Sequence, residues 1–277
     1  MSRPRSDRLG VGFWVAMCWL VAVVGAALLA PVLPLVSPDD VDVLAAEAGP
    51  SWAHWFGTDS VGRDVFSRTV WGARTSLVVG VLAIAVGVLV GGLLGLIAGY
   101  ARGLVDHVVS YVFDSLLAFP ALVFAILVTA LTERSLFWVT AVLAVLAVAP
   151  IGRLARGATL AVVEEPFVLV SRALGARHWR IMTRELLPNV AVPMGAFALL
   201  GCGIAIVAEG SLAFLGLSVA DGLSWGTIIV DGSSGRTLRA APHVALLPIT
   251  VLFLTVLSLN WIGDSLRRRA DRRSAND

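Results

Sequence analysis

Long apolar stretches separated by shorter polar segments make up most of the chain from residue 11 onward. A helix crosses a bilayer with roughly 20 predominantly apolar residues, and six stretches approach or exceed that length. The pattern therefore predicts an all-α integral membrane protein with six transmembrane helices. The predicted spans are residues 11–36, 76–100, 108–131, 136–152, 189–214 and 241–263.

Glycines recur at every fourth position of the second predicted span. Residues four apart lie on the same face of a helix, and small residues on such a face let a neighbouring helix approach closely in lipid. We therefore expect close helix packing along this face. The glycines are Gly87, Gly91, Gly95 and Gly99.

Two acidic residues and one proline stand out within the predicted spans. Asp114 lies in the third span, and Glu209 lies near the outer end of the fifth. Ionisable residues inside a membrane are costly and often functional, so each is a candidate for the translocation path. A structural bond to neighbouring groups is the equal alternative for both. Pro120 predicts a kink or an end in the third span.

The composition agrees with a membrane protein and limits its chemistry. The chain is 58% hydrophobic and 14% charged, whereas soluble domains carry about 25% charged residues. Its basic residues are all arginine, with no lysine. A Walker A loop needs a lysine at the nucleotide phosphates, so any nucleotide energy must come from another chain.

Arginine placement orients the predicted spans. With the N-terminus inside, 15 of the 21 arginines fall on the inner side and 6 on the outer side. Cytoplasmic segments are enriched in arginine, so both termini are predicted to be cytoplasmic. The predicted parts are an N-terminus (1–10), a first helix (11–36), an extracytoplasmic loop (37–75), a five-helix core (76–264) and a basic tail (265–277). The tail suits anionic headgroups and gives no reason to expect nucleic acid.

Other chemical motifs are weak. Cys18 and Cys202 show no disulfide or metal-ligand spacing, and the histidines do not cluster, so no metal site is expected. "GLSWG" (222–226) matches the nucleophile-elbow pattern around Ser224. That motif needs a strand-to-helix turn in an α/β sheet, and a loop between membrane helices does not supply one. A membrane hydrolase is therefore only a remote alternative.

The polar segment 153–188 lies between the fourth and fifth spans and begins with a predicted helix. In "EEPFVLVSRALG" (164–175), Pro166 suits the first helical turn, and the acidic pair before it suits the positive helix end. Gly175 suits the position after the helix, where a positive φ is wanted.

A second helix is predicted from about Arg177 to Leu187, ending at Pro188. It is amphipathic: one face holds Trp179, Met182 and Leu186, and the opposite face holds Arg177, Arg180 and Arg184. Such a hairpin could lie on the membrane surface or insert into a groove of a cytoplasmic partner. The residues alone leave both readings open.

The same stretch, "SRALGARHWRIMTRELLPN" (171–189), resembles the cytoplasmic EAA loop of bacterial ABC-importer permeases. Further blocks are similar to the dipeptide/oligopeptide/nickel subfamily, in particular to the second permease of its pair. They cover nearly the whole chain in order: "HWFGTDSVGRDVFSRTVWGARTSLVVG" (54–80), "DSLLAFPAL" (114–122), "AEGSLAFLGL" (208–217), "SWGTIIVDG" (224–232) and "LNWIGDSLR" (259–267). One departure is that the E-A-A of the loop aligns with Leu169, Val170 and Ser171, so the signature glutamate is absent.

The resemblance implies a type I ABC-importer permease in a bacterial cell membrane. Its implied partners are a homologous permease, two cytoplasmic ATPases and an extracytoplasmic binding protein. The chain itself would be no enzyme and bind no cofactor, because ATP and magnesium sit on the ATPases. Peptides are the first substrate class implied, with nickel or another small solute as the alternative; a membrane scaffold is a remote third.

The resemblance also assigns residues of the loop. The implied ATPase-coupling residues are Arg172, Ala173, Leu174, Gly175, Ala176 and Arg177. The residues expected to brace this segment are Glu165, Trp179, Ile181, Met182, Leu186, Leu187 and Pro188.

Overall fold

Helices account for most of the chain in the computed structural model, which describes residues 10–220 and 222–274, with side chains as far as Arg269. No β-strand occurs within these residues, so the all-α prediction is confirmed. Nearly all of the predicted N-terminal segment (1–10) and the end of the tail lie outside the described residues. The helices are α1 (Val11–Leu29), α2 (Val65–Val86), α3 (Gly92–Ala101), α4 (Gly103–Ala118), α5 (Ala121–Leu131), α6 (Leu136–Val162), α7 (Pro166–Ala173), α8 (His178–Arg180), α9 (Leu187–Phe214), α10 (Trp225–Gly232), α11 (Thr237–Ala240) and α12 (His243–Ser274).

Two π-helical segments join shorter helices into long ones. Gly87–Gly91 connects α2 to α3, and Ile181–Leu186 connects α8 to α9. Five helices are then apolar and long enough to cross a membrane: Val11–Leu29, Val65–Ala101, Leu136–Val162, His178–Phe214 and His243–Arg269. The pair α4 and α5 makes a sixth crossing if it is counted as one broken span.

The break in the third predicted span lies at Pro120, as expected. α4 and α5 are bent by 81° relative to each other. Phe119 is extended, with φ −78° and ψ 131°, because a proline disfavours the α conformation of the residue before it. The prediction of a kink or an end at Pro120 in the third span is therefore confirmed.

Several other helix ends differ from the predicted ones. α1 stops at Leu29 rather than 36, because Pro31 and Pro34 follow. The second long helix begins at Val65 rather than 76. Asp64 caps that start, since its Oδ1 accepts a hydrogen bond of 2.7 Å from the Ser67 N–H.

Two helices, α6 and α12, run past their predicted C-terminal limits into basic sequence. α6 continues to Val162, beyond the predicted end at 152, and α12 continues to Ser274, beyond 263. In α6 the extension includes Arg153 and Arg156, whose charges are neutralised by carboxylates of α4. A prediction from hydropathy alone ends the span just before the first arginine, because it does not include these ion pairs.

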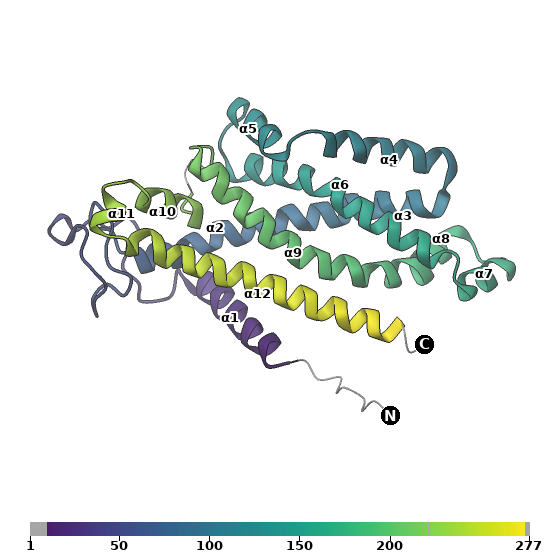
Figure 1. Cartoon of the computed structure of the whole chain (residues 1–277), viewed down its shortest axis with the longest axis horizontal. Helices are drawn as coiled ribbons and strands as arrows, with labels where there is room; N and C mark the ends of the chain where they lie inside the picture. Colours follow the sequence, from purple (N-terminus) through teal and green to yellow (C-terminus); the bar gives the residue numbers. More distant parts are fainter. Residues whose placement is uncertain (1–9, 221, 275–277) are drawn as a thin grey trace.

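The long helices lie side by side along the longest axis of the molecule (Figure 1). α6 and α9 pack against α2, and their contact buries Val79, Val142 and Ile151; α12 packs on α9, and α1 packs on α12. α7 and α8 lie at one end of this bundle, and α10, α11 and residues 30–64 lie at the other end (Figure 1). That the α7 end faces the cytoplasm stays a prediction.

The glycine face of α2–α3 lies directly against α6. A Cβ on Gly91 would collide with the backbone oxygen of Val148, and one on Gly95 with that of Gly152. At Gly99 an added Cβ would lie 2.8 Å from Thr159 Cβ, and at Gly87 it would lie 2.8 Å from a Cβ of α6. The two helix backbones therefore touch along this face, which only glycine permits.

Candidate functional site

The segment aligned with the EAA loop forms a hairpin, which we define as residues 166–180. Pro166 opens α7, and Gly175 follows it with a φ of 78°. The Gly175 N–H donates to the Arg172 carbonyl at 3.0 Å, and the Ala176 N–H donates to the Ser171 carbonyl at 3.1 Å. These two bonds form a Schellman motif, which ends a helix with a residue in the left-handed region. The chain therefore reverses sharply at Gly175.

Apolar side chains fasten the base of the hairpin to the bundle. Val168, Ile181 and Leu186 are fully buried, and Met182 is half-buried beside them. Trp179, expected to brace the segment together with Met182 and Leu186, is instead 75% exposed. The rotation of the helix about its axis places Ile181 against the bundle and leaves Trp179 on the exposed side.

The turn of the hairpin is exposed. Leu174 is 83% exposed, and Ala173, Gly175 and Arg177 are exposed beside it. Leu169, which occupies the position of the family glutamate, is 50% exposed. The tip therefore presents the apolar side chains of Leu169 and Leu174 together with the arginines Arg172 and Arg177.

A polar contact that the sequence did not predict ties the hairpin to α3. The Tyr100 hydroxyl lies 2.6 Å from His178 Nδ1, and the Arg172 guanidinium lies 5.7 Å from the centroid of the Tyr100 ring. A second contact joins α7 to the π-helical segment after the hairpin, where the Ser171 hydroxyl donates a hydrogen bond of 3.3 Å to the Glu185 carboxylate. No spacing rule links Tyr100 to residues so far along the chain, so only the fold brings them together.

The predicted end of the second hairpin helix at Pro188 is wrong. The helix runs without interruption from His178 to Phe214. A proline inside an α-helix removes one hydrogen bond and clashes with the carbonyl four residues earlier. The π-helical segment Ile181–Leu186 precedes the proline and absorbs this clash. The Asn189 side chain then donates a hydrogen bond of 2.6 Å to the Glu185 carbonyl.

Asp114 is part of a row of ion pairs between α4 and α6. It pairs with Arg153, and Asp106 pairs with Arg156 through a bond of 2.7 Å. The structural alternative for Asp114 is therefore the one its contacts support. Near the hairpin, Arg102 continues the row with a bond of 2.6 Å to Glu164.

Glu209 is fully buried where α9, α2 and α10 meet. Its Oε1 accepts a hydrogen bond of 2.6 Å from the Ser218 hydroxyl, and its Oε2 has no partner among the described residues. The hydroxyls of Ser76 and Ser224 lie in the same buried cluster: Ser76 accepts from the Trp225 N–H at 3.1 Å, and Ser224 accepts from the Thr227 N–H at 3.2 Å. Ser224 thus caps α10, and no strand leads into it among the described residues.

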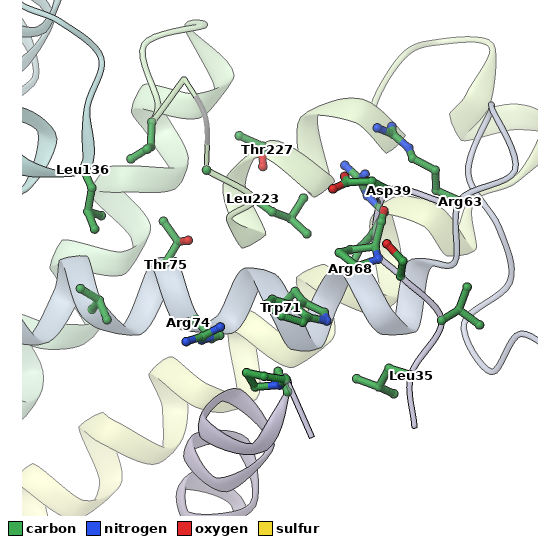
Figure 2. Close-up of a pocket in the computed structure, with 18 of the residues that line it drawn as sticks. Leu35, Asp39, Arg63, Arg68, Trp71, Arg74, Thr75, Leu136, Leu223 and Thr227 are labelled. Carbon is green, nitrogen blue, oxygen red and sulfur yellow. Dashed lines mark hydrogen bonds between the residues drawn. The ribbon is translucent and has the colours of Figure 1, made fainter. Parts of the chain in front are cut away.

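A cavity of about 910 Å³ (Figure 2) opens at the end of the bundle that holds α10 and residues 30–64, opposite to the hairpin (Figure 1). α2, residues 30–39 and the loop before α10 line it. Two of its arginines belong to a charge network: Arg63 bonds Asp59 at 2.6 Å, and Arg68 bonds Asp231 at 3.2 Å. Within the described residues, no group of His, Cys, Asp and Glu could hold a metal ion.

The chain is similar to known membrane transport proteins over most of its length. Residues 91–275 match the family model "Binding-protein-dependent transport system inner membrane component". The "Glutathione transport system permease protein GsiD" of Pectobacterium atrosepticum is 38% identical over 80% of this chain and 74% of its own length. The "Dipeptide transport system permease protein DppC" of Alkalihalophilus pseudofirmus is 37% identical over 93% of this chain and 84% of its own length.

A solved structure has the same fold. One chain of the MetNI methionine ABC transporter, in an inward-facing conformation, matches with a TM-score of 0.57. The match covers 72% of this chain and 96% of that one at 18% identity. At that identity the likeness shows the fold alone.

Proposed function

Since the chain belongs to the family of binding-protein-dependent transport system inner membrane components and is a permease subunit of an ABC importer, we propose that the solute it imports is a peptide. The observation that supports this class is the similarity to DppC, which is named as a dipeptide permease and matches 93% of this chain. The GsiD relative is named for glutathione, itself a small peptide. These names favour peptides over the nickel alternative.

The proposed assembly contains four kinds of subunit. This chain would form half of the pathway with a homologous permease, two cytoplasmic ATPases would hold ATP and magnesium, and an extracytoplasmic protein would deliver the peptide. The absence of lysine supports a separate ATPase, since the chain cannot form a Walker A loop.

We propose that the hairpin is the site where an ATPase grips this chain. Its exposed tip supports this role, because Leu174 projects from a turn fixed by two backbone bonds. Its buried base joins it to the helix His178–Phe214. A displacement of the tip would therefore move that helix as a unit, which is what switching between two conformations requires.

Uptake measurements test the substrate class. Cells lacking the gene for this chain are expected to lose uptake of radiolabelled alanine peptides, from dipeptide to pentapeptide, and to regain it with the gene restored. Uptake of radioactive nickel is expected to stay unchanged in the same cells. Loss of nickel uptake with intact peptide uptake would contradict the proposal.

Co-purification tests the ATPase site. Leu174→Glu places a charge on an exposed side chain and leaves the core intact, and we expect it to weaken ATPase binding by roughly tenfold or more, since burying one leucine stabilises by about 1.5–3 kcal/mol. Leu44→Glu is the matched control, because Leu44 is 100% exposed and belongs to residues 30–64, which lie at the opposite end of the bundle (Figure 1). Equal ATPase recovery with both variants would argue against the hairpin as the ATPase site.

A further inference from the structure

Loop 37–64 precedes α2 and is held in a defined shape by polar contacts within itself. The Ala48 N–H donates a hydrogen bond of 2.9 Å to the Thr58 hydroxyl. Nδ1 of His54 lies 2.9 Å from Oδ2 of Asp64, the residue that caps α2. The loop is therefore tied to the start of α2 and presents its surface side chains from an ordered backbone.

Large apolar side chains project from this loop. Leu44 is 100% exposed and Trp52 is 97% exposed, and Val43 and Trp55 are exposed as well. Apolar residues exposed singly are normal on a protein, whereas a concentration of them marks an interaction site. Tryptophan is also among the residues that contribute most to binding at protein interfaces. The loop therefore has the apolar composition of an interaction surface.

The same loop is strongly acidic. Residues 37–62 contain five acidic residues and neither arginine nor lysine. These five are Asp39, Asp40, Asp42, Glu47 and Asp59. The first three are exposed, whereas Asp59 is buried and bonds Arg63 at 2.6 Å. The exposed part of the loop therefore combines negative charge with large apolar side chains.

This combination favours a protein partner over a lipid surface. Residues that anchor a protein at the membrane interface combine tryptophan and tyrosine with lysine and arginine. Anionic headgroups attract basic segments and repel acidic ones. A protein surface that carries basic residues beside an apolar patch complements the loop in both respects.

The position of the loop limits the direction from which a partner reaches it. In Figure 1, the loop extends beyond α10 and α11 along the longest axis, at the end of the bundle opposite to the hairpin. Lipids and a second permease lie beside the helices, along the sides of the bundle. A partner that covers the loop approaches along the axis, from the aqueous phase. Because the hairpin is proposed to bind cytoplasmic ATPases, that phase is the extracytoplasmic one.

We infer that loop 37–64 is the docking surface for the extracytoplasmic binding protein, and that this protein presents lysines or arginines around an apolar patch. The inference rests on the proposed import function and adds the place and the charge of the contact. Leu44 and Trp52 supply the apolar part of the surface, and Asp40 belongs to its acidic part. Opposite charges raise the rate of association, and burial of the apolar side chains stabilises the complex.

Photo-cross-linking in living cells tests the identity of the partner. The photoreactive residue p-benzoylphenylalanine replaces Leu44 in one strain and Leu104 in a control strain, and cross-linked products are identified by mass spectrometry. Leu104 is 80% exposed at the start of α4, at the hairpin end of the bundle (Figure 1). We expect a solute-binding protein to be cross-linked from position 44 and not from position 104. A cross-link from position 44 to lipid or to another permease, or no cross-link, overturns the inference.

Binding kinetics test the apolar part of the surface. The cross-linked protein is purified and added to the assembled permeases and ATPases in phosphatidylcholine nanodiscs, and binding is followed by surface plasmon resonance. Leu44→Glu is expected to weaken binding by roughly tenfold or more, the effect of one leucine that is no longer buried. Leu104→Glu is the matched control and is expected to bind as the unaltered complex does. Equal affinities for the two variants overturn the inference.

The same measurement tests the charge of the partner. Asp40→Lys is expected to slow association by about threefold or more at about 50 mM salt and to have little effect at about 500 mM salt, because salt screens surface charges. Glu133→Lys is the matched control, since it reverses an exposed charge in the segment between α5 and α6. If the Asp40 variant associates as fast as this control or faster, the partner is not basic and the inference is wrong.

The two proposals fail separately. If peptide uptake depends on this chain while the Leu44 and Asp40 variants bind normally, only the docking surface is wrong. If the cross-linked protein binds a solute other than peptides, the proposed substrate class is wrong and the docking surface stands.

Discussion

At the scale of single residues, Glu209 is the most constrained polar group of the described membrane helices. It is fully buried, and three serines from other elements surround it. The Ser218 hydroxyl donates to Glu209, and the hydroxyls of Ser76 and Ser224 accept backbone N–H groups from the first turn of α10. The carboxyl group therefore ties α9 to the loop that follows it, beside the start of α10.

Substitutions at Glu209 distinguish its role as a hydrogen-bond acceptor from the effect of its side-chain volume on packing. Glu209→Met keeps the approximate volume and removes both acceptors, and we expect it to lower the free energy of unfolding by about 1–3 kcal/mol, the cost of unpaired buried groups. Glu209→Gln keeps an acceptor for Ser218 and is expected to lose less. Thermal unfolding of the purified chain in detergent measures both. If the methionine variant melts at or above the glutamine variant, the serine cluster does not depend on Glu209.

Sequence singled out Asp114 and Glu209 correctly as unusual, but it could not choose between pathway and structure. The choice depends on side-chain partners that only the fold reveals, Arg153 for Asp114 and Ser218 for Glu209. The same limit applies to Trp179. A helical wheel places it on the apolar face, yet which face meets the bundle is decided by the rotation of the helix, and that rotation buries Ile181 instead.

At the scale of elements, the contact between α2–α3 and α6 depends on the absence of side chains. Along this contact a glycine of one helix lies against the backbone of the other. Helix association in lipid gains little from hydrophobicity, so close van der Waals contact is the main source of stability.

Gly95→Ala tests this contact. The added methyl group meets the Gly152 oxygen and the backbone of Arg156, so we expect a loss of about 1–3 kcal/mol from overpacking. The matched control is Gly157→Ala on α6, where an added Cβ meets nothing within 4 Å. The control is expected to be neutral or slightly stabilising, because alanine favours helix. If both variants unfold at similar temperatures, the helix of α2 and α3 can move away from α6 without a loss of stability.

Hydropathy predicted where helices lie better than where they end. The helix ends that hydropathy missed contain polar residues, and the fold supplies hydrogen-bond or ion-pair partners for these residues. Asp64 caps a helix that begins eleven residues before the predicted span, and arginines on α6 pair with α4. Continuation of the helix through Pro188 required a π-helical segment, which sequence patterns do not reveal.

At the scale of the whole molecule, the bond between Tyr100 and His178 joins the ends of two long helices beside the hairpin. Through this bond, the helix Val65–Ala101 would move together with the tip of the hairpin. Removing it should therefore affect the transmission of movement more than the binding of the ATPase.

Tyr100→Phe removes only the hydroxyl. We expect unchanged ATPase co-purification and roughly a two- to fivefold lower uptake per ATP hydrolysed, since one hydrogen bond contributes about 1 kcal/mol. Tyr111→Phe is the matched control, because Tyr111 is 74% exposed on α4. Uptake and hydrolysis are measured together in proteoliposomes. Unchanged coupling in the Tyr100 variant would mean that the hairpin acts through α8 and α9 alone.

The uninterrupted helix from His178 to Phe214 has a mechanical consequence. With 37 residues and a rise of 1.5 Å each, it is about 55 Å long, well beyond the roughly 30 Å of a hydrocarbon core. A tilt of about 10° displaces one end of such a rod by roughly 10 Å relative to the other. A tilt that begins at the hairpin is therefore carried along the helix and becomes a displacement of solute size between the two membrane surfaces.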